Sequence, residues 1–161
     1  VKKLIKDKIT LKKLESNMIL VFAGVRKKSN TANYIAKTYV QKLNKIKKNN
    51  ILEVIKHAKI AKKLILEKKF NDFGLLLNET WKVKKELSNE VSNDKLDYIY
   101  NLGLKSGALG GKLLGAGGAG FFLFYIPKRN REKFLKAFKN FTSIPFKFEK
   151  EGSSIIFNET K

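Results

Sequence analysis

The sequence predicts an α+β domain in which helices cover a mostly antiparallel sheet. Two observations carry this prediction: several amphipathic stretches separate the first strand-like segment from the second, and short strand-like segments close the chain. The 161 residues, 43% of them hydrophobic, suit a domain with a core of its own and exclude a wholly disordered basic tail. We therefore expect one domain over residues 1–161.

The N-terminal part of the sequence contains one strong strand candidate. Residues 17–25, NMILVFAGV, are almost wholly apolar and contain a glycine close to the end, which is typical of a buried strand. Residues 1–7 alternate weakly between apolar and polar side chains, and this pattern also fits a short strand.

Four amphipathic helices are predicted next, because apolar residues recur three and four positions apart. Residues 29–30 offer a cap for the first helix, and two asparagines at 49–50 are expected to separate it from the second. The polar residues 92–94 cap the fourth. The predicted helices cover residues 32–46, 51–65, 71–87 and about 94–105.

The last third changes character and alternates between strands and a helix. FFLFYI, at residues 121–126, indicates a buried strand, and Pro127 suits a helix start. A helix follows with Phe134, Leu135 and Phe138 facing inward. Two final strands are predicted at 144–148 and 153–157, joined by a turn at 151–152.

Several classes of protein are excluded by composition. With no cysteine there is no disulfide or thiolate metal site, and the single histidine, His57, excludes a site of several histidines and suits a boundary position on a helix. The longest uncharged run, residues 113–127, is shorter than the ~20 apolar residues of a membrane helix. No signal peptide opens the chain. We expect a cytoplasmic protein with no metal site and no membrane partner.

The net charge of +21, from 35 basic and 14 acidic residues, raises the alternative of a lysine-rich nucleic-acid-binding domain. Two features weigh against it. Only three basic residues are arginine, the residue best suited to bidentate phosphate contacts, and the lysines are spread over every predicted helix. Nucleic acid is therefore the less favoured partner.

Glycine is concentrated in one segment, since eight of the 11 glycines lie within residues 103–120. Dense glycine permits positive φ and lets backbone N–H groups approach an anion. The phosphate-loop pattern of nucleotide hydrolases does not fit around Gly111 and Lys112, because Ser106 and Leu113 stand where it needs Gly and Ser or Thr.

A dinucleotide fingerprint also fails in this segment. Gly115, Gly117 and Gly120 match its glycine spacing, but they lead into a strand where the fingerprint must open a helix. No acidic residue follows about 20 positions later to hold a ribose.

The sequence KLLGAGGAG followed by an apolar strand resembles the C-terminal glycine-rich motif of the GHMP kinases, which include galactokinase, homoserine kinase and mevalonate kinase. The resemblance covers nearly the whole chain and is greatest to the D-glycero-D-manno-heptose 7-phosphate kinases. Five segments carry it in the family's order: 22–29 (FAGVRKKS), 76–88 (LLNETWKVKKELS), 92–100 (SNDKLDYIY), 107–127 (GALGGKLLGAGGAGFFLFYIP) and 145–157 (PFKFEKEGSSIIF).

This resemblance implies a ferredoxin-like C-terminal lobe of an ATP-dependent, Mg²⁺-requiring sugar-phosphate kinase. The family's phosphate-cradling Gly-Leu-Gly-Ser-Ser loop has no counterpart in this chain. The catalytic residues are therefore expected in an N-terminal lobe, which would be the partner of this one. Arg26 and Lys27 stand where the branch usually has one arginine, and Asn78 replaces a frequent histidine. These departures leave a fucose- or galactose-type kinase as the alternative.

The resemblance also implies the site residues. The nucleotide- and substrate-proximal loop comprises Lys112, Gly115, Ala116, Gly117, Gly118, Ala119 and Gly120, with alanine at 119 where the family usually has glycine. Candidates for substrate binding are Arg26, Lys27, Trp81 and Lys84. For each there is a structural alternative: a tight helix-to-strand connection for the loop, a core position for Trp81, and solvated surface charges for the basic residues.

Overall fold

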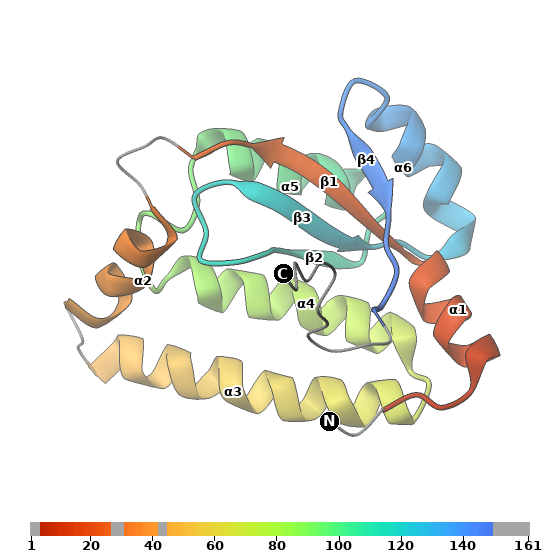
Figure 1. Cartoon of the computed structure of the whole chain (residues 1–161), viewed down its shortest axis with the longest axis horizontal. Coiled ribbons are helices and arrows are strands. Elements are labelled where there is room, and N and C mark those ends of the chain that lie inside the picture. The colour runs from red at the N-terminus through yellow and green to blue at the C-terminus, as the bar shows by residue number, and fades with distance from the viewer. Residues whose placement is uncertain (1–3, 27–30, 42–44, 150–161) are drawn as a thin grey trace, which may run out of the picture.

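The fold is α+β, as predicted, with four antiparallel strands in the order β2-β3-β1-β4 (Figure 1). The structure is a computed structural model and describes residues 4–26, 31–41 and 45–149. The central strands pair in a simple register, with Leu20 opposite Leu123 and Val21 opposite Phe122. The strands are β1 (Met18–Gly24), β2 (Gly110–Leu113), β3 (Gly120–Tyr125) and β4 (Ser143–Pro145).

Helices α5 and α6 cover one face of the sheet, and α4 runs along its β2 edge. In Figure 1, α5 runs behind the sheet, α4 runs beneath β2, and α3 lies beneath α4. The helices are α1 (Lys8–Ser16), α2 (Ala32–Gln41), α3 (Lys45–Leu66), α4 (Phe70–Lys85), α5 (Asp94–Lys105) and α6 (Arg131–Ala137), with a 3₁₀ turn η1 (Lys128–Asn130) before α6.

Two apolar clusters form the core. The larger one lies between the sheet and α5 and α6, and aromatic rings dominate it because β3 directs alternate phenylalanines to that face. The smaller one joins α1, the start of α4 and the far end of β3. The largest members of the first cluster are Trp81, Tyr100, Phe122, Phe124, Phe134 and Phe138, and the second contains Leu14, Met18, Phe70, Phe73 and Tyr125.

The apolar strands were predicted well, and the short ones were not. β1 and β3 agree with the predicted strands to within one residue at each end. The strand expected within residues 1–7 is wrong for the described part, since residues 4–7 lead into α1, which Asp7 caps by accepting from the backbone N–H groups of Ile9 and Thr10. The sequence predicts a loop where the structure has β2. β4 covers only 143–145, and the expected strand 153–157 with its turn lies outside the described residues.

The predicted break at residues 49–50 is also wrong, because α3 runs through both asparagines. Asparagine costs a helix only about half a kcal/mol, and here the buried Asn50 gains a partner. Its Nδ2 donates to Glu86 Oε2 at 3.0 Å, which ties α3 to the end of α4. His57 lies on the same interface, with Nδ1 3.0 Å from Thr80 Oγ1.

Two further details concern the helix ends and faces. The predicted cap at 29–30 lies outside the described residues, and at the start of α2 Thr31 Oγ1 accepts from the N–H of Tyr34. In α6, Phe134 and Phe138 are buried as predicted, but Leu135 is 42% exposed. α6 is short and preceded by a 3₁₀ turn, so only one side of it meets the sheet.

Candidate functional site

The glycine-rich segment forms a tight connection between the antiparallel strands β2 and β3. Leu114 N–H donates to Phe121 O at 2.9 Å, which closes the start of the connection. Gly117 has φ +119°, which favours glycine, and a β-carbon there would lie 2.8 Å from the Cα of Val91. We call residues 114–119 the glycine loop.

A buried lysine from α4 holds the first part of the glycine loop. Lys84 is only 8% exposed, and its Nζ donates to Leu113 O at 3.2 Å and to Gly115 O at 2.6 Å. Burial, reinforced by the neighbouring charges of Lys112 and Arg26, lowers the pKa of Lys84 to about 8. The loop carbonyls therefore supply the polar contacts that this buried ammonium requires.

Two other side chains hold the next carbonyls of the glycine loop. Arg26, just after β1, donates from Nε to Gly117 O at 2.9 Å. Tyr39, on α2, donates its hydroxyl to Ala116 O, and burial raises the pKa of that hydroxyl. Three elements distant in sequence therefore converge on four carbonyls within residues 113–117.

The cations around the glycine loop carry no acidic partner among the residues that the structure describes. No ion pair joins Arg26, Lys84 or Lys112 to a carboxylate there. Lys112, on β2, is partly exposed, and in the same described part its ammonium has neither a hydrogen bond nor an ion pair. This end of the sheet thus has a positive charge that an anion could neutralise.

Among the candidates for substrate binding, Arg26 and Lys84 lie at the glycine loop, beside Lys112. Trp81 does not reach a surface: it is 0% exposed and packs 5.4 Å from Phe122 and 5.9 Å from Tyr100 between ring centroids. It is therefore a core residue and not a platform for a sugar. Lys27 lies outside the described residues.

Tyr39 is the contact that the sequence did not reveal. Its spacing on the predicted helix places it with the apolar residues, and its ring does pack against the core as a partly buried side chain. The hydroxyl at the end of that ring is what reaches the loop. The one sequence signal for this contact is a tyrosine on an otherwise aliphatic helix face, because a buried tyrosine hydroxyl usually forms a hydrogen bond.

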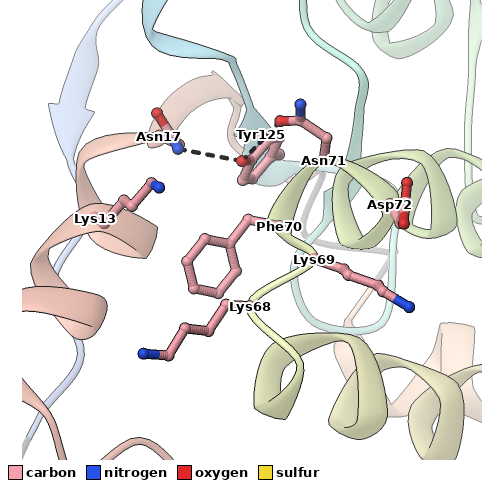
Figure 2. Close-up of a pocket in the computed structure, with 8 residues that line it drawn as sticks. All are labelled: Lys13, Asn17, Lys68, Lys69, Phe70, Asn71, Asp72 and Tyr125. Carbon is pink, nitrogen blue, oxygen red and sulfur yellow. Dashed lines mark hydrogen bonds between the residues drawn. The ribbon is translucent and has the colours of Figure 1, made fainter.

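A second depression lies at the opposite end of β3, around Tyr125 (Figure 2). Asn17 Nδ2 donates to the Tyr125 hydroxyl at 3.1 Å, and that hydroxyl donates to Asn71 Oδ1 at 3.2 Å. In Figure 2 the ammonium groups of Lys68 and Lys69 point away from one another. The charges therefore do not converge on one point, and we assign no ligand to this depression.

The residues that the structure describes contain neither a cluster of metal-ligating side chains nor a helix able to span a membrane. Nowhere in that part of the chain do three or more His, Asp or Glu side chains gather closely enough to hold a metal ion. Within the same residues, no helix combines the length and apolar character needed to cross a bilayer.

Comparison with known proteins identifies the family. The family described as "GHMP kinases C terminal" matches residues 61–143. The chain is 31% identical over 142 residues to the D-glycero-alpha-D-manno-heptose 7-phosphate kinase of Campylobacter jejuni, covering 86% of this chain and 41% of that protein. It is 26% identical over 127 residues to the bifunctional fucokinase/GDP-fucose pyrophosphorylase of Arabidopsis thaliana, covering 78% of this chain and 12% of that protein.

Solved structures agree with the sequence match. The mevalonate kinase of Methanococcus jannaschii superposes with a TM-score of 0.63 at 24% identity, over 87% of this chain and 42% of that one. The chain thus spans less than half the length of each of these relatives. The match of more than half of the chain, together with the shared fold, shows that this chain belongs to the GHMP kinase family, through its C-terminal domain.

Proposed function

We propose that residues 1–161 form the C-terminal lobe of an ATP-dependent sugar-phosphate kinase. The observation that carries the proposal is the glycine loop, whose carbonyls are bound by side chains at the end of the sheet and beside which lie three cations that form no ion pair with a carboxylate among the described residues. Phosphoryl transfer depends mainly on positioning and on neutralising charge, and this arrangement suits both. In this proposal an N-terminal lobe provides the catalytic residues.

Each basic residue then has a defined task. Lys112 is the candidate for direct contact with a phosphate, because its ammonium is uncommitted within the described residues. Arg26 offers its remaining guanidinium donors after Nε has bound Gly117 O. Lys84 has its ammonium directed to two carbonyls and acts on the loop.

ATP would supply the phosphoryl group, and Mg²⁺ would neutralise its phosphates. We assign the Mg²⁺ ligands to no residue of this chain, because its described part offers no cluster of acidic side chains for a metal. Transfer forms a bond between the acceptor oxygen and the γ-phosphorus and breaks the bond to the β–γ bridging oxygen. The acceptor proton leaves to a base that we expect in the N-terminal lobe.

For the acceptor we propose the anomeric hydroxyl of a heptose 7-phosphate. The support is the 31% identity to a D-glycero-alpha-D-manno-heptose 7-phosphate kinase. The alternative is an unphosphorylated sugar such as fucose, which the weaker match to the plant fucokinase supports. The surplus of cations near the loop favours an acceptor that carries its own phosphate. We also propose a cytoplasmic location, because an ATP-dependent kinase requires a compartment that supplies ATP.

The experiment that tests this function is a phosphotransfer assay of the full-length protein containing this chain. Purified protein is incubated with ATP and Mg²⁺ and with heptose 7-phosphate, fucose or galactose in turn, and ADP and the sugar product are measured. We expect the highest kcat/KM with heptose 7-phosphate. A higher kcat/KM for fucose or galactose would contradict the heptose assignment, and no turnover of any sugar would contradict the kinase assignment.

A further inference from the structure

We infer that Lys84 and Tyr39 are positioning residues that, with Arg26, hold the glycine loop by its carbonyls and turn its N–H groups toward the ligand. The inference rests on the proposed function, because it concerns how the loop is prepared for a phosphate-bearing substrate. It adds a role that neither residue's place in the sequence indicates. Tyr39 lies on a helix face whose pattern predicts core packing. The family resemblance makes Lys84 a candidate for direct contact with the substrate.

The direction of the loop N–H groups follows from peptide geometry. In a trans peptide the C=O and the next residue's N–H point to opposite sides. Gly115 O and Ala116 O are bound by Lys84 and Tyr39, so the N–H groups of Ala116 and Gly117 point away from these side chains. The following N–H, of Gly118, is already used by Val91 O at 2.9 Å. Within the described residues neither Ala116 N–H nor Gly117 N–H donates a hydrogen bond, so these two successive groups are available to an anion, as in backbone anion sites.

The burial of Lys84 indicates that its charged group has a role beyond packing in the interior. An apolar side chain of similar length at this position would avoid the cost of burying a charge and is often neutral or stabilising. Its neighbours on α4 behave differently: Lys82 is 58% exposed and pairs with Glu79 at 3.0 Å, and Lys85 pairs with Asp97 at 3.0 Å. Lys84 alone on this turn is directed to backbone carbonyls.

The local charge balance supports the same conclusion. Lys84 is surrounded by the cations Lys112 and Arg26, and both lower its pKa. Within the described residues no carboxylate forms an ion pair with any of the three. Such a cluster is unfavourable for the isolated lobe and becomes favourable when an anion binds to it. We call Lys84, Tyr39 and Arg26, with their hydrogen bonds to the loop carbonyls, the clamp. The clamp and the negative charge of the ligand would therefore each stabilise the other.

The test uses the full-length protein with three variants: Lys84→Met, Tyr39→Phe and the control Lys82→Met. The readouts are kcat and KM for both substrates, and hydrogen–deuterium exchange of residues 114–119. We expect Lys84→Met to lower kcat by about 10- to 100-fold with a smaller change in KM, since misplacement of about 1 Å costs about that much. Tyr39→Phe should lower kcat less, and both should speed exchange in the glycine loop. Lys82→Met should match wild type.

The outcomes separate this inference from the proposed function. Wild-type kcat and wild-type exchange in folded Lys84→Met would overturn the role of Lys84, and the same result in Tyr39→Phe would overturn that of Tyr39. If Lys84→Met does not fold, Tyr39→Phe, which removes only the hydroxyl, decides whether the clamp exists. If wild type phosphorylates no sugar, the proposed function fails, while loop exchange in the two variants still tests the clamp.

Discussion

At the scale of single residues, Lys84 shows how one position can be costly for stability and useful for a site. Its ammonium is removed from water beside two other cations, and two backbone carbonyls and the face of the Trp81 ring, whose centroid lies 6.0 Å away, compensate. A lysine in water has a pKa of 10.5, whereas the pKa of Lys84 is lowered to about 8. The unfolded chain therefore holds this proton more tightly than the folded one.

This difference predicts how stability depends on pH. Between pH 8 and 10.5 the unfolded state keeps the proton on Lys84 and the folded state loses it, so the free energy of unfolding rises with pH in this window. The rise from this one group is at most about 3 kcal/mol. Urea unfolding of wild type and Lys84→Met across the window measures it, since the difference between the two pH profiles reports the presence of this ammonium. Parallel pH profiles for the two proteins would contradict the lowered pKa.

Predictions for single residues succeeded where the local sequence pattern is compatible with only one conformation or degree of burial. The glycines of the loop and the inward Phe134 and Phe138 are such cases. Trp81 had two interpretations, because an aromatic ring in a leucine-rich helix fits a core position best but also fits a binding platform. Whether Lys84 was buried could not be predicted, because that depends on where the glycine loop places its carbonyls.

At the scale of elements, the contact of α4 with β2 positions the glycine loop. The helix comes so close to the strand that a β-carbon at Gly110 would lie 2.2 Å from Gly74 O and 2.6 Å from Asn78 N. Both of these atoms belong to the helix backbone, so no side-chain rotation relieves the overlap. Gly110 therefore sets the distance between α4 and β2, and with it the reach of Lys84 to the loop.

We predict that Gly110→Ala separates α4 from β2 and destabilises the fold by about 1–3 kcal/mol, the usual cost of overpacking. Thermal or urea unfolding of the purified protein measures the loss. Lys112→Ala, on the same strand with a partly exposed side chain, is the matched control and should change the stability by less than about 0.5 kcal/mol. Equal stability of Gly110→Ala and wild type would show that the helix can move without cost.

The elements predicted from sequence were those with a long apolar pattern. β1, β3, α4 and α5 were found because six to sixteen residues repeat one periodicity. β2 was missed because its four residues include two glycines, which resemble a loop when read without their partner strand. α3 was predicted with a break because asparagine is a weak helix former, and the contact with Glu86 that offsets this is not visible in sequence.

At the scale of the whole molecule, basic side chains far outnumber the acidic side chains that could form ion pairs with them, and the net charge is +21. Four lysine–carboxylate ion pairs lie within the described residues, and the whole chain has 35 Lys and Arg against 14 Asp and Glu. Most lysines therefore repel one another through water, and this repulsion is screened by salt over about 8 Å at 0.15 M ionic strength.

We predict that the melting temperature of the chain rises as NaCl is increased from about 20 mM to about 300 mM, because screening relieves this repulsion. Sucrose at equal osmolality is the control for changes in water activity. In the same series, binding to a short random-sequence DNA duplex should show a shallow dependence on salt and vanish near physiological salt. Binding that persists at physiological salt, with a steep dependence of affinity on salt, would favour the nucleic-acid alternative over the kinase.

The family relationship gives a second prediction at this scale. The chain spans 41% of the heptose kinase relative, and we expect the remaining catalytic groups in the other lobe. Purified residues 1–161 should therefore transfer no phosphate from ATP to any sugar under conditions in which the full-length protein is active. Measurable turnover by residues 1–161 would overturn this division of labour.

The position of β1 in the sheet has a consequence for how the chain folds. This apolar strand precedes both of its partner strands, since Met18 pairs with Tyr125 and Val21 with Ser143, each more than 100 residues later. Both of its edges thus stay unpaired until those later residues have been synthesised, and such non-local closure is slow. Until then MILVFAG is an aggregation-prone segment that a chaperone would need to cover.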